Sequence, residues 1–168
     1  YDGYGYHEGR FKKRLSVRTQ QTPIGFDELA IRSYDQGLGR SFWNSAKGNL
    51  DKIVKLVSIF PQHRRNDLWR GVGVSITYTL GMKQSVLENF MKNEAIDLVG
   101  FKAGVALVVK SRSKAKTIND ETEKMAQTIL GRSCGEIAEK LAELETEFLL
   151  DAKNTYADWI GSVESVNQ

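Results

Sequence analysis

The ionisable residues best placed to do chemistry in this sequence lie beside three glycine pairs. Asp2 precedes the first pair, Asp35 and Arg40 flank the second, and the third is preceded by Arg64, Arg65, Asp67 and Arg70. A charged side chain tolerates burial only when an opposite charge or hydrogen bonds compensate it. We therefore expect interhelical ion pairs that fix the register of packed helices. The alternative is a polar patch that grips a ligand.

A hydrolase or metal site is poorly supported by residue types and spacing. Residues 131–135 read Gly-Arg-Ser-Cys-Gly, which matches a nucleophile elbow, but that motif needs a preceding strand and a histidine base. Helical patterns flank the segment, and His7 and His63 lie far upstream. Ser133 with Glu136 fits a helix-capping box better. A lone Cys134 excludes a disulfide within the chain and a cysteine-based zinc site. Because no other motif fits, we predict no catalytic residue, no metal and no cofactor.

Aromatic side chains also lie near the glycine pairs. Tyr1, Tyr34, Trp43, Trp69 and Tyr78 could line a concave groove, although aromatic residues at helical spacing more often fill a core. The candidate binding residues share a polar or aromatic side chain close to a glycine pair: His7, Asp35, Arg40, Trp43, Arg64, Asp67, Trp69 and Tyr78.

The glycine pairs themselves recur at a fixed spacing. Gly3, Gly37 and Gly71 each begin a Gly-x-Gly pair and lie 34 residues apart, and a weaker copy at Gly104 follows 33 residues later. Self-similarity at such a period is typical of stacked structural repeats. We predict an all-α fold of stacked helical hairpins with a repeat of about 34 residues, resembling TPR arrays and other α-solenoids. The predicted repeat core contains Gly3, Gly5, Gly37, Gly39, Gly71, Gly73 and Gly104.

Helix is the better interpretation of the glycine segments despite its cost. Each glycine in a helix costs roughly 1 kcal/mol relative to alanine. However, Leu68, Val72, Ile76 and Leu80 fall four residues apart and form one apolar face. A stripe of small residues beside that face lets another helix approach closely. A dinucleotide-binding loop needs a third glycine and a preceding strand, and neither is present.

The remaining pattern supplies the other helices and the domain organisation. We expect a single domain over 1–168, with core repeats in 1–116 and capping helices in 117–168. Because the chain starts at Tyr1 inside a repeat, we interpret it as the C-terminal portion of a longer protein. The helices are expected at about 1–13, 27–43, from Asn49 to Phe60, from Pro61 to Gly81, at 85–93, 96–110 and 120–130, from Ser133 onward, and around Trp159.

Charge is distributed unevenly along the chain. Residues 1–84 contain 14 Lys/Arg and 7 Asp/Glu, whereas residues 85–168 contain 10 and 14. This dipolar layout favours head-to-tail contacts between copies or an acidic partner for the first half. The acidic second half disfavours nucleic acid, and neither basic tract, 12–14 or 110–116, forms a known nucleic-acid motif. The longest apolar run, 98–109, is interrupted by Lys102 and is too short to span a bilayer. Because a lone Cys134 fits a reducing compartment and no signal peptide is visible, we expect a cytoplasmic protein.

Three segments resemble a known bacterial family of unknown function. They read DGYGYH at 2–7, DQGLGRSFW at 35–43 and FPxxRRxDLWRGVG at 60–73. Members of that family are encoded in enediyne natural-product biosynthesis gene clusters and in similar cassettes elsewhere. The chain resembles the C-terminal part of a longer member, and the likeness is weaker beyond Gly104. The resemblance implies an accessory role in making, handling or tolerating a reactive polyketide and supplies no catalytic residues.

We therefore expect a non-catalytic helical-repeat scaffold or binding module in such a pathway. Its partner would be a protein, a hydrophobic small molecule or a second copy of the chain. The alternative is an enzyme or carrier acting on a hydrophobic polyketide, with His7, Asp35 and Arg40 together in a pocket. A nucleic-acid-binding protein is the least favoured hypothesis.

Overall fold

The computed structural model describes residues 1–166, which form ten α-helices and no strand, as the sequence predicts for an all-α fold. Along the chain, four helices that pack side by side, called the long helices although the first has only 10 residues, alternate with four others, and a final hairpin follows. The helices are α1 (Asp2–Phe11), α2 (Lys13–Thr19), α3 (Glu28–Ser45), α4 (Leu50–Ser58), α5 (Gln62–Thr79), α6 (Gln84–Phe90), α7 (Leu98–Lys114), α8 (Asp120–Leu130), α9 (Cys134–Leu150) and α10 (Tyr156–Ser165).

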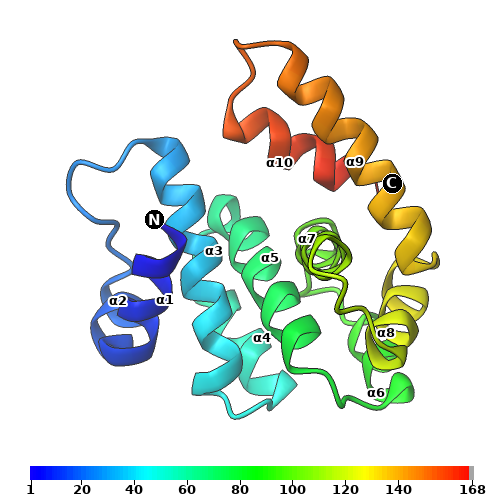
Figure 1. The fold of residues 1–168 in the computed structure, drawn as a ribbon. Helices are drawn as coiled ribbons and strands as arrows, with labels where there is room; N and C mark the ends of the chain where they lie inside the picture. Colours follow the sequence, from blue (N-terminus) through cyan, green and yellow to red (C-terminus); the bar gives the residue numbers. More distant parts are fainter. Residues whose placement is uncertain (167–168) are drawn as a thin grey trace.

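The helices α1, α3, α5 and α7 lie side by side in a row (Figure 1). They run parallel, because each is followed by a segment that returns the chain to the starting edge of the row. The short helices α4, α6 and α8 line one side of the row, and the α9–α10 hairpin packs on α7 at the other side (Figure 1). The stacked helical arrangement is thereby confirmed, while the assignment to TPR-like repeats stays a prediction.

Glycines bring the backbones of the long helices into direct contact. A Cβ atom at Gly37 would overlap the carbonyl oxygen of Asp2, and one at Gly71 would overlap that of Gln36. The same overlap with a carbonyl oxygen of an adjacent long helix applies at Gly5, Gly39, Gly73, Gly100 and Gly104. Only a residue without a side chain permits this separation. The small-residue face expected from the sequence therefore forms three successive interfaces, between α1 and α3, α3 and α5, and α5 and α7.

Gly3 is the exception among the predicted core glycines. It is exposed in the first turn of α1, and a Cβ atom there would meet nothing within 4 Å. Its inclusion in the repeat core was wrong, because α1 places Gly5 and Gly9, rather than Gly3, against α3.

Apolar side chains fill the space on both sides of the row. The larger cluster contains Leu38, Phe42, Leu68, Val72 and Ile76, so the predicted four-residue spacing on α5 faces the core. A second cluster lies where the α9–α10 hairpin covers α7 and is formed by Ala103, Ala106, Val109, Ala126, Cys134, Ile137, Leu141, Val163 and Val166. The larger cluster joins α3, α5 and α7, and the second fixes the α9–α10 hairpin on α7.

Local signals determine several helix ends. The Asn49 side chain accepts a hydrogen bond from the Lys52 amide and begins α4, and Ser133 with Glu136 forms the predicted capping box of α9. The sequence prediction differs at the N-terminus, where the chain breaks at Lys12 and starts a separate helix, α2. Within residues 1–166, no helix combines the length and apolar character needed to cross a membrane.

Candidate binding site

Asp35 and Arg64 form a buried ion pair between α3 and α5. The Arg64 guanidinium donates from Nε to Asp35 Oδ2 at 2.7 Å and from a terminal nitrogen to Oδ1. A further nitrogen donates to the carbonyl oxygen of Gln20 at 2.6 Å. Burial raises the pKa of the Asp35 carboxyl, and the hydrogen bonds from Arg64 oppose that rise. Arg64 therefore compensates for the burial of the Asp35 carboxylate.

A second charged centre links α3, α5 and α10. Asp67 accepts hydrogen bonds from Arg32 at 3.3 Å and from Arg70. Arg70, which is fully buried, also donates to Gln36 Oε1 at 2.7 Å and to Glu164 Oε1 at 3.2 Å. Burial raises the pKa of Glu164, and the nearby Arg70 and Arg32 lower it. Arg32 and Asp67 join α3 to α5 as an interhelical arginine–aspartate pair, whereas Arg70 and Asp67 pair within α5 and Arg70 reaches α10 through Glu164.

The two charged centres border a cleft of about 590 Å³ between α3, α5 and α10. Its walls include Asp35, Arg64 and Asp67, together with His63 and Glu164. Most of these charges are already satisfied by one another, so the pairs have a clear structural role in joining helices. The cleft contains neither His7 nor Arg40, and the predicted trio with Asp35 is not assembled there.

The remaining candidate residues lie apart from this cleft. His7 is exposed on α1, with Nδ1 at 3.5 Å from Glu8 Oε1. Arg40 pairs with Asp2, and its guanidinium carbon lies 5.3 Å from the centre of the Tyr6 ring. These two residues therefore face α1 and its surface instead of a shared pocket.

The predicted aromatic groove is not formed. Trp69 is fully buried, and its ring packs edge-to-face on Phe90 with a centroid separation of 5.9 Å. Trp43 packs against the core beside Gly48, whereas Tyr78 is exposed and hydrogen-bonds to Ser111. The rings point into different environments because successive long helices bury some aromatic positions and expose others.

The Ser133–Cys134 segment has no feature of a nucleophile. Ser133 caps α9, and Cys134 is buried, with a pKa raised to about 12 by burial and by the neighbouring Glu123. A thiol with so high a pKa is protonated at neutral pH. Among residues 1–166, no group of three or more His, Cys, Asp or Glu side chains is arranged to hold a metal ion.

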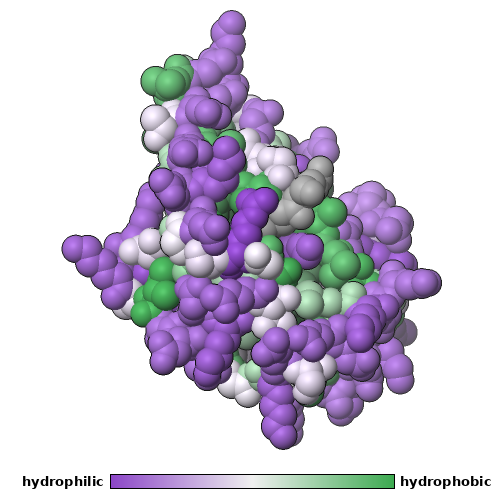
Figure 2. Space-filling model, turned by 90° about the vertical axis from the view of Figure 1, so that its right-hand side faces the viewer, coloured by the Kyte–Doolittle hydropathy of each residue, from purple (hydrophilic) through white to green (hydrophobic). Residues whose placement is uncertain are grey.

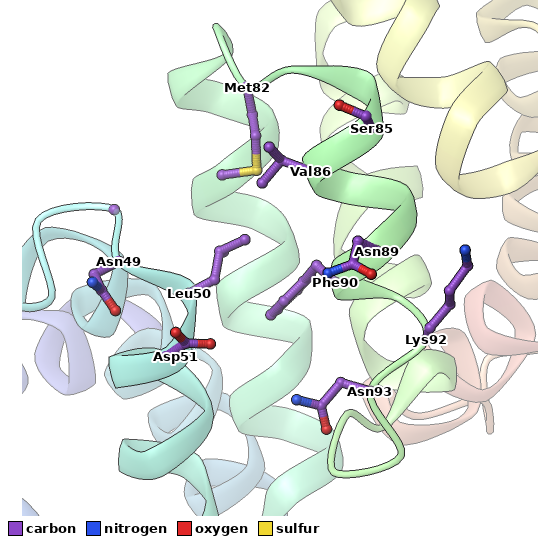
Figure 3. A pocket seen from close by; sticks show the side chains of 11 residues that line it. Asn49, Leu50, Asp51, Met82, Ser85, Val86, Asn89, Phe90, Lys92 and Asn93 are labelled. Carbon is purple, nitrogen blue, oxygen red and sulfur yellow. The ribbon is translucent and has the colours of Figure 1, made fainter.

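A groove on the opposite side of the row has a different character. It measures about 650 Å³ and lies between the start of α4 and the helix α6 (Figure 3). Leu50, Met82, Val86 and Phe90 supply apolar side chains that point toward the groove from both walls (Figure 3). Its rim is polar and consists of Asn49, Asp51, Ser85, Asn89, Lys92 and Asn93. The groove can thus bury an apolar molecule and orient its polar ends.

Sequence reasoning missed this groove. The available signal was the short helix α6, in which Val86 and Phe90 are four residues apart although Val86 is 42% exposed. An exposed valine beside a buried phenylalanine is unremarkable in sequence. Only the position of Leu50 and Met82 in the fold shows that these side chains share one hollow.

Comparison with known families places the chain. A profile described as Protein of unknown function (DUF1702) matches residues 1–166. The chain belongs to this family. No curated protein and no solved structure matches the chain. Membership in DUF1702 agrees with the resemblance to a family of unknown function and leaves the choice of site to the geometry.

Proposed function

We propose that the chain is a non-catalytic binding module, accessory to enediyne-type polyketide biosynthesis, that holds a hydrophobic molecule in the α4–α6 groove. The observation that carries the proposal is that four apolar side chains, Leu50, Met82, Val86 and Phe90, share one hollow with polar residues around them. Ligand sites commonly have volumes of roughly 300–1,000 Å³ and an apolar lining with a few polar groups. The groove has such a volume, and its lining combines four apolar side chains with polar ones.

The pathway assignment rests on the three segments that resemble the enediyne-cluster family. The ligand in such a pathway would be a hydrophobic polyketide. A groove with Leu50, Val86 and Phe90 on its walls would shield such a chain from water, and the amides of Asn49 and Asn89 could hydrogen-bond to its oxygen atoms. Binding by shielding requires no general acid or base.

The test is a fluorescence titration with a conjugated tetraene fatty acid and its methyl ester as probes. We expect saturable binding of both probes by the wild-type chain. Val86→Glu places a carboxylate in the groove and should weaken binding by about tenfold or more, because burying the probe would desolvate that charge. Val99→Glu is the matched control, since Val99 is 38% exposed, resembles Val86 in exposure, and lies on α7 outside the groove.

Two results would overturn the proposal. One is the absence of saturable binding of either probe by a folded wild-type chain. The other is an equal loss of binding in the Val86→Glu and Val99→Glu variants, which would place the probe somewhere other than the groove.

A further inference from the structure

The helices α2 and α4 form a basic surface with two adjoining hollows. The basic surface consists of Lys13, Arg14, Arg18, Lys52 and Lys55. One hollow measures about 680 Å³ and the other about 250 Å³, and Lys13 and Ile59 line both. Their apolar lining is supplied mainly by Val17, Leu56 and Ile59, and no acidic side chain lines either hollow. Ile59 is 52% exposed.

The cations of the basic surface lack partners of their own. None of the five lies within ion-pair distance of a carboxylate among residues 1–166, whereas the nearby Lys12 pairs with Glu8 at 3.1 Å. The buried arginines of α5 differ from these five cations, because Arg64 and Arg70 each form an ion pair with an aspartate. The basic surface is therefore free to receive an anionic partner.

The helix α9 carries the opposite charge in a regular pattern. Glu139, Glu143 and Glu147 are exposed and spaced four residues apart on α9, and the exposed Asp151 follows at its C-cap; we call these four residues the acidic stripe. Like charges at this spacing destabilise a helix by a few tenths of a kcal/mol per pair. Lys140 lies 3.2 Å from Glu143, but no cation of residues 1–166 lies within ion-pair distance of the other three acids.

The end of α9 adds two further unfavourable features. The last turn contains no basic residue, so the carboxylates there meet the negative end of the helix dipole without compensation. Leu149 and Leu150 are 72% and 83% exposed in the last turn of α9. Figure 2 shows hydrophobic surface near the tip of the α9–α10 hairpin amid mainly hydrophilic side chains. A cationic partner with apolar hollows would relieve both features.

We propose that the acidic stripe of one copy of this chain docks on the basic surface of a second copy, with Leu149 and Leu150 entering the hollows beside Ile59. Figure 1 places α2 and α9 at opposite ends of the row of helices, so the contact joins two copies head to tail. Such a contact is heterologous and can extend to further copies. It uses neither the α4–α6 groove nor the charged cleft.

A second copy fits this surface better than an anionic membrane does. Both halves of the contact, the charges and the exposed leucines, are present on the same chain. An anionic membrane would attract the basic surface but repel the acidic stripe, and it would leave Leu149 and Leu150 uncovered.

Sedimentation velocity over a concentration series measures the association. We expect assemblies larger than a monomer at about 0.05 M salt and their weakening by about tenfold or more at about 0.5 M, because exposed charge pairs are screened. Charge reversal of the basic surface by R14E with R18E should abolish the association. Charge reversal of the acidic stripe by E139K with E147K should do the same.

Mixing the two reversed variants provides the decisive measurement. Each variant alone has lost most of the charge on one of its two contact surfaces and should stay monomeric. In the mixture, the intact basic surface of one variant meets the intact acidic stripe of the other, and association should return. This rescue separates a direct contact from general damage to the fold, which mixing cannot repair.

The control variant K83E with K124E changes the net charge by the same amount as R14E with R18E, at exposed positions outside the contact. It should associate like the wild type. The proposal is overturned if the wild-type chain is monomeric at every concentration and salt, if the mixture fails to associate, or if the control loses association equally. It is also overturned if vesicles of phosphatidylglycerol bind the basic surface while the chain stays monomeric.

Discussion

The α-carbon of Gly37 lies directly against the main-chain carbonyl oxygen of Asp2, and the same relationship joins Gly71 to Gln36 one helix further along the row. These contacts set how closely the long helices pack. Hydrogen bonds between the same helices, such as that from Gln36 Nε2 to Asp2 Oδ2 at 2.8 Å, depend on that separation. The glycines and the polar side chains therefore form a single structural unit.

Gly37→Ala should destabilise the chain by about 3 kcal/mol or more, because the new methyl group would overlap backbone that cannot rotate away. Urea unfolding followed by circular dichroism measures the free energy of unfolding. Gly161→Ala is the control: Gly161 lies in α10 with open space around it, and alanine there should stabilise by up to about 1 kcal/mol through helix propensity. Equal effects of the two substitutions would contradict the packing role of Gly37.

Arg64→Ala should cost about 3–5 kcal/mol of unfolding free energy, since it leaves the Asp35 carboxylate buried without its partner. Asp35→Leu combined with Arg64→Met replaces the ion pair with apolar side chains and should recover much of that loss. A double-mutant cycle in urea measures the coupling. If the two single substitutions are additive, the pair is not the stabilising unit that the geometry indicates.

Protonation of Glu145 should weaken the attachment of α9 to α7. Lys110 and Lys114 each donate to Glu145 at 2.7 Å, and their hydrogen bonds lower its pKa below the ordinary value of 4.5. A carboxyl with a lowered folded-state pKa contributes stability that is complete above its unfolded pKa and is lost as the pH falls through the folded value. The melting temperature should therefore exceed that of Glu145→Gln at pH 7, and the difference should vanish at strongly acidic pH. A difference that is independent of pH would exclude the ion pairs as its cause.

Cys134 should resist thiol reagents in the folded chain. Burial and Glu123 raise its pKa to about 12, so little thiolate exists at pH 8 and access is closed. Labelling with a chromogenic disulfide should proceed slowly in buffer and rapidly in urea, where the thiol is exposed and its pKa returns toward the ordinary value. Rapid labelling of the native chain would show that α9 opens readily.

The sequence supports the fold prediction well for specific reasons. Helical spacing in Leu68, Val72 and Ile76 depends on local geometry, and capping by Asn49 and Ser133 depends on neighbours three residues away. Such patterns involve residues within four positions of one another and can therefore be recognised in the sequence. The break at Lys12 was missed because both flanking segments favour helix, and only the packing of α1 on α3 separates them from α2.

The site prediction was less successful because it relied on closeness along the chain. His7, Trp69 and Tyr78 all lie near glycine pairs, yet they end on the surface of α1, in the core and on the surface of α5. The pairing of Asp35 with Arg64 was foreseeable in type, since buried charges need partners, but the choice of partner was not. The groove between α4 and α6 had only a weak sequence signal, the four-residue spacing of Val86 and Phe90 on α6.

The sequence by itself determined that the chain is helical, where most helices begin, and that small residues would face a neighbouring helix. Tertiary structure alone decided which carbonyl oxygen each glycine meets, which arginine joins which aspartate, and where Leu50 and Val86 face one another. The physical reason is range. Helix formation and capping act within about one turn of the chain, whereas grooves and buried ion pairs depend on side chains brought together from distant segments.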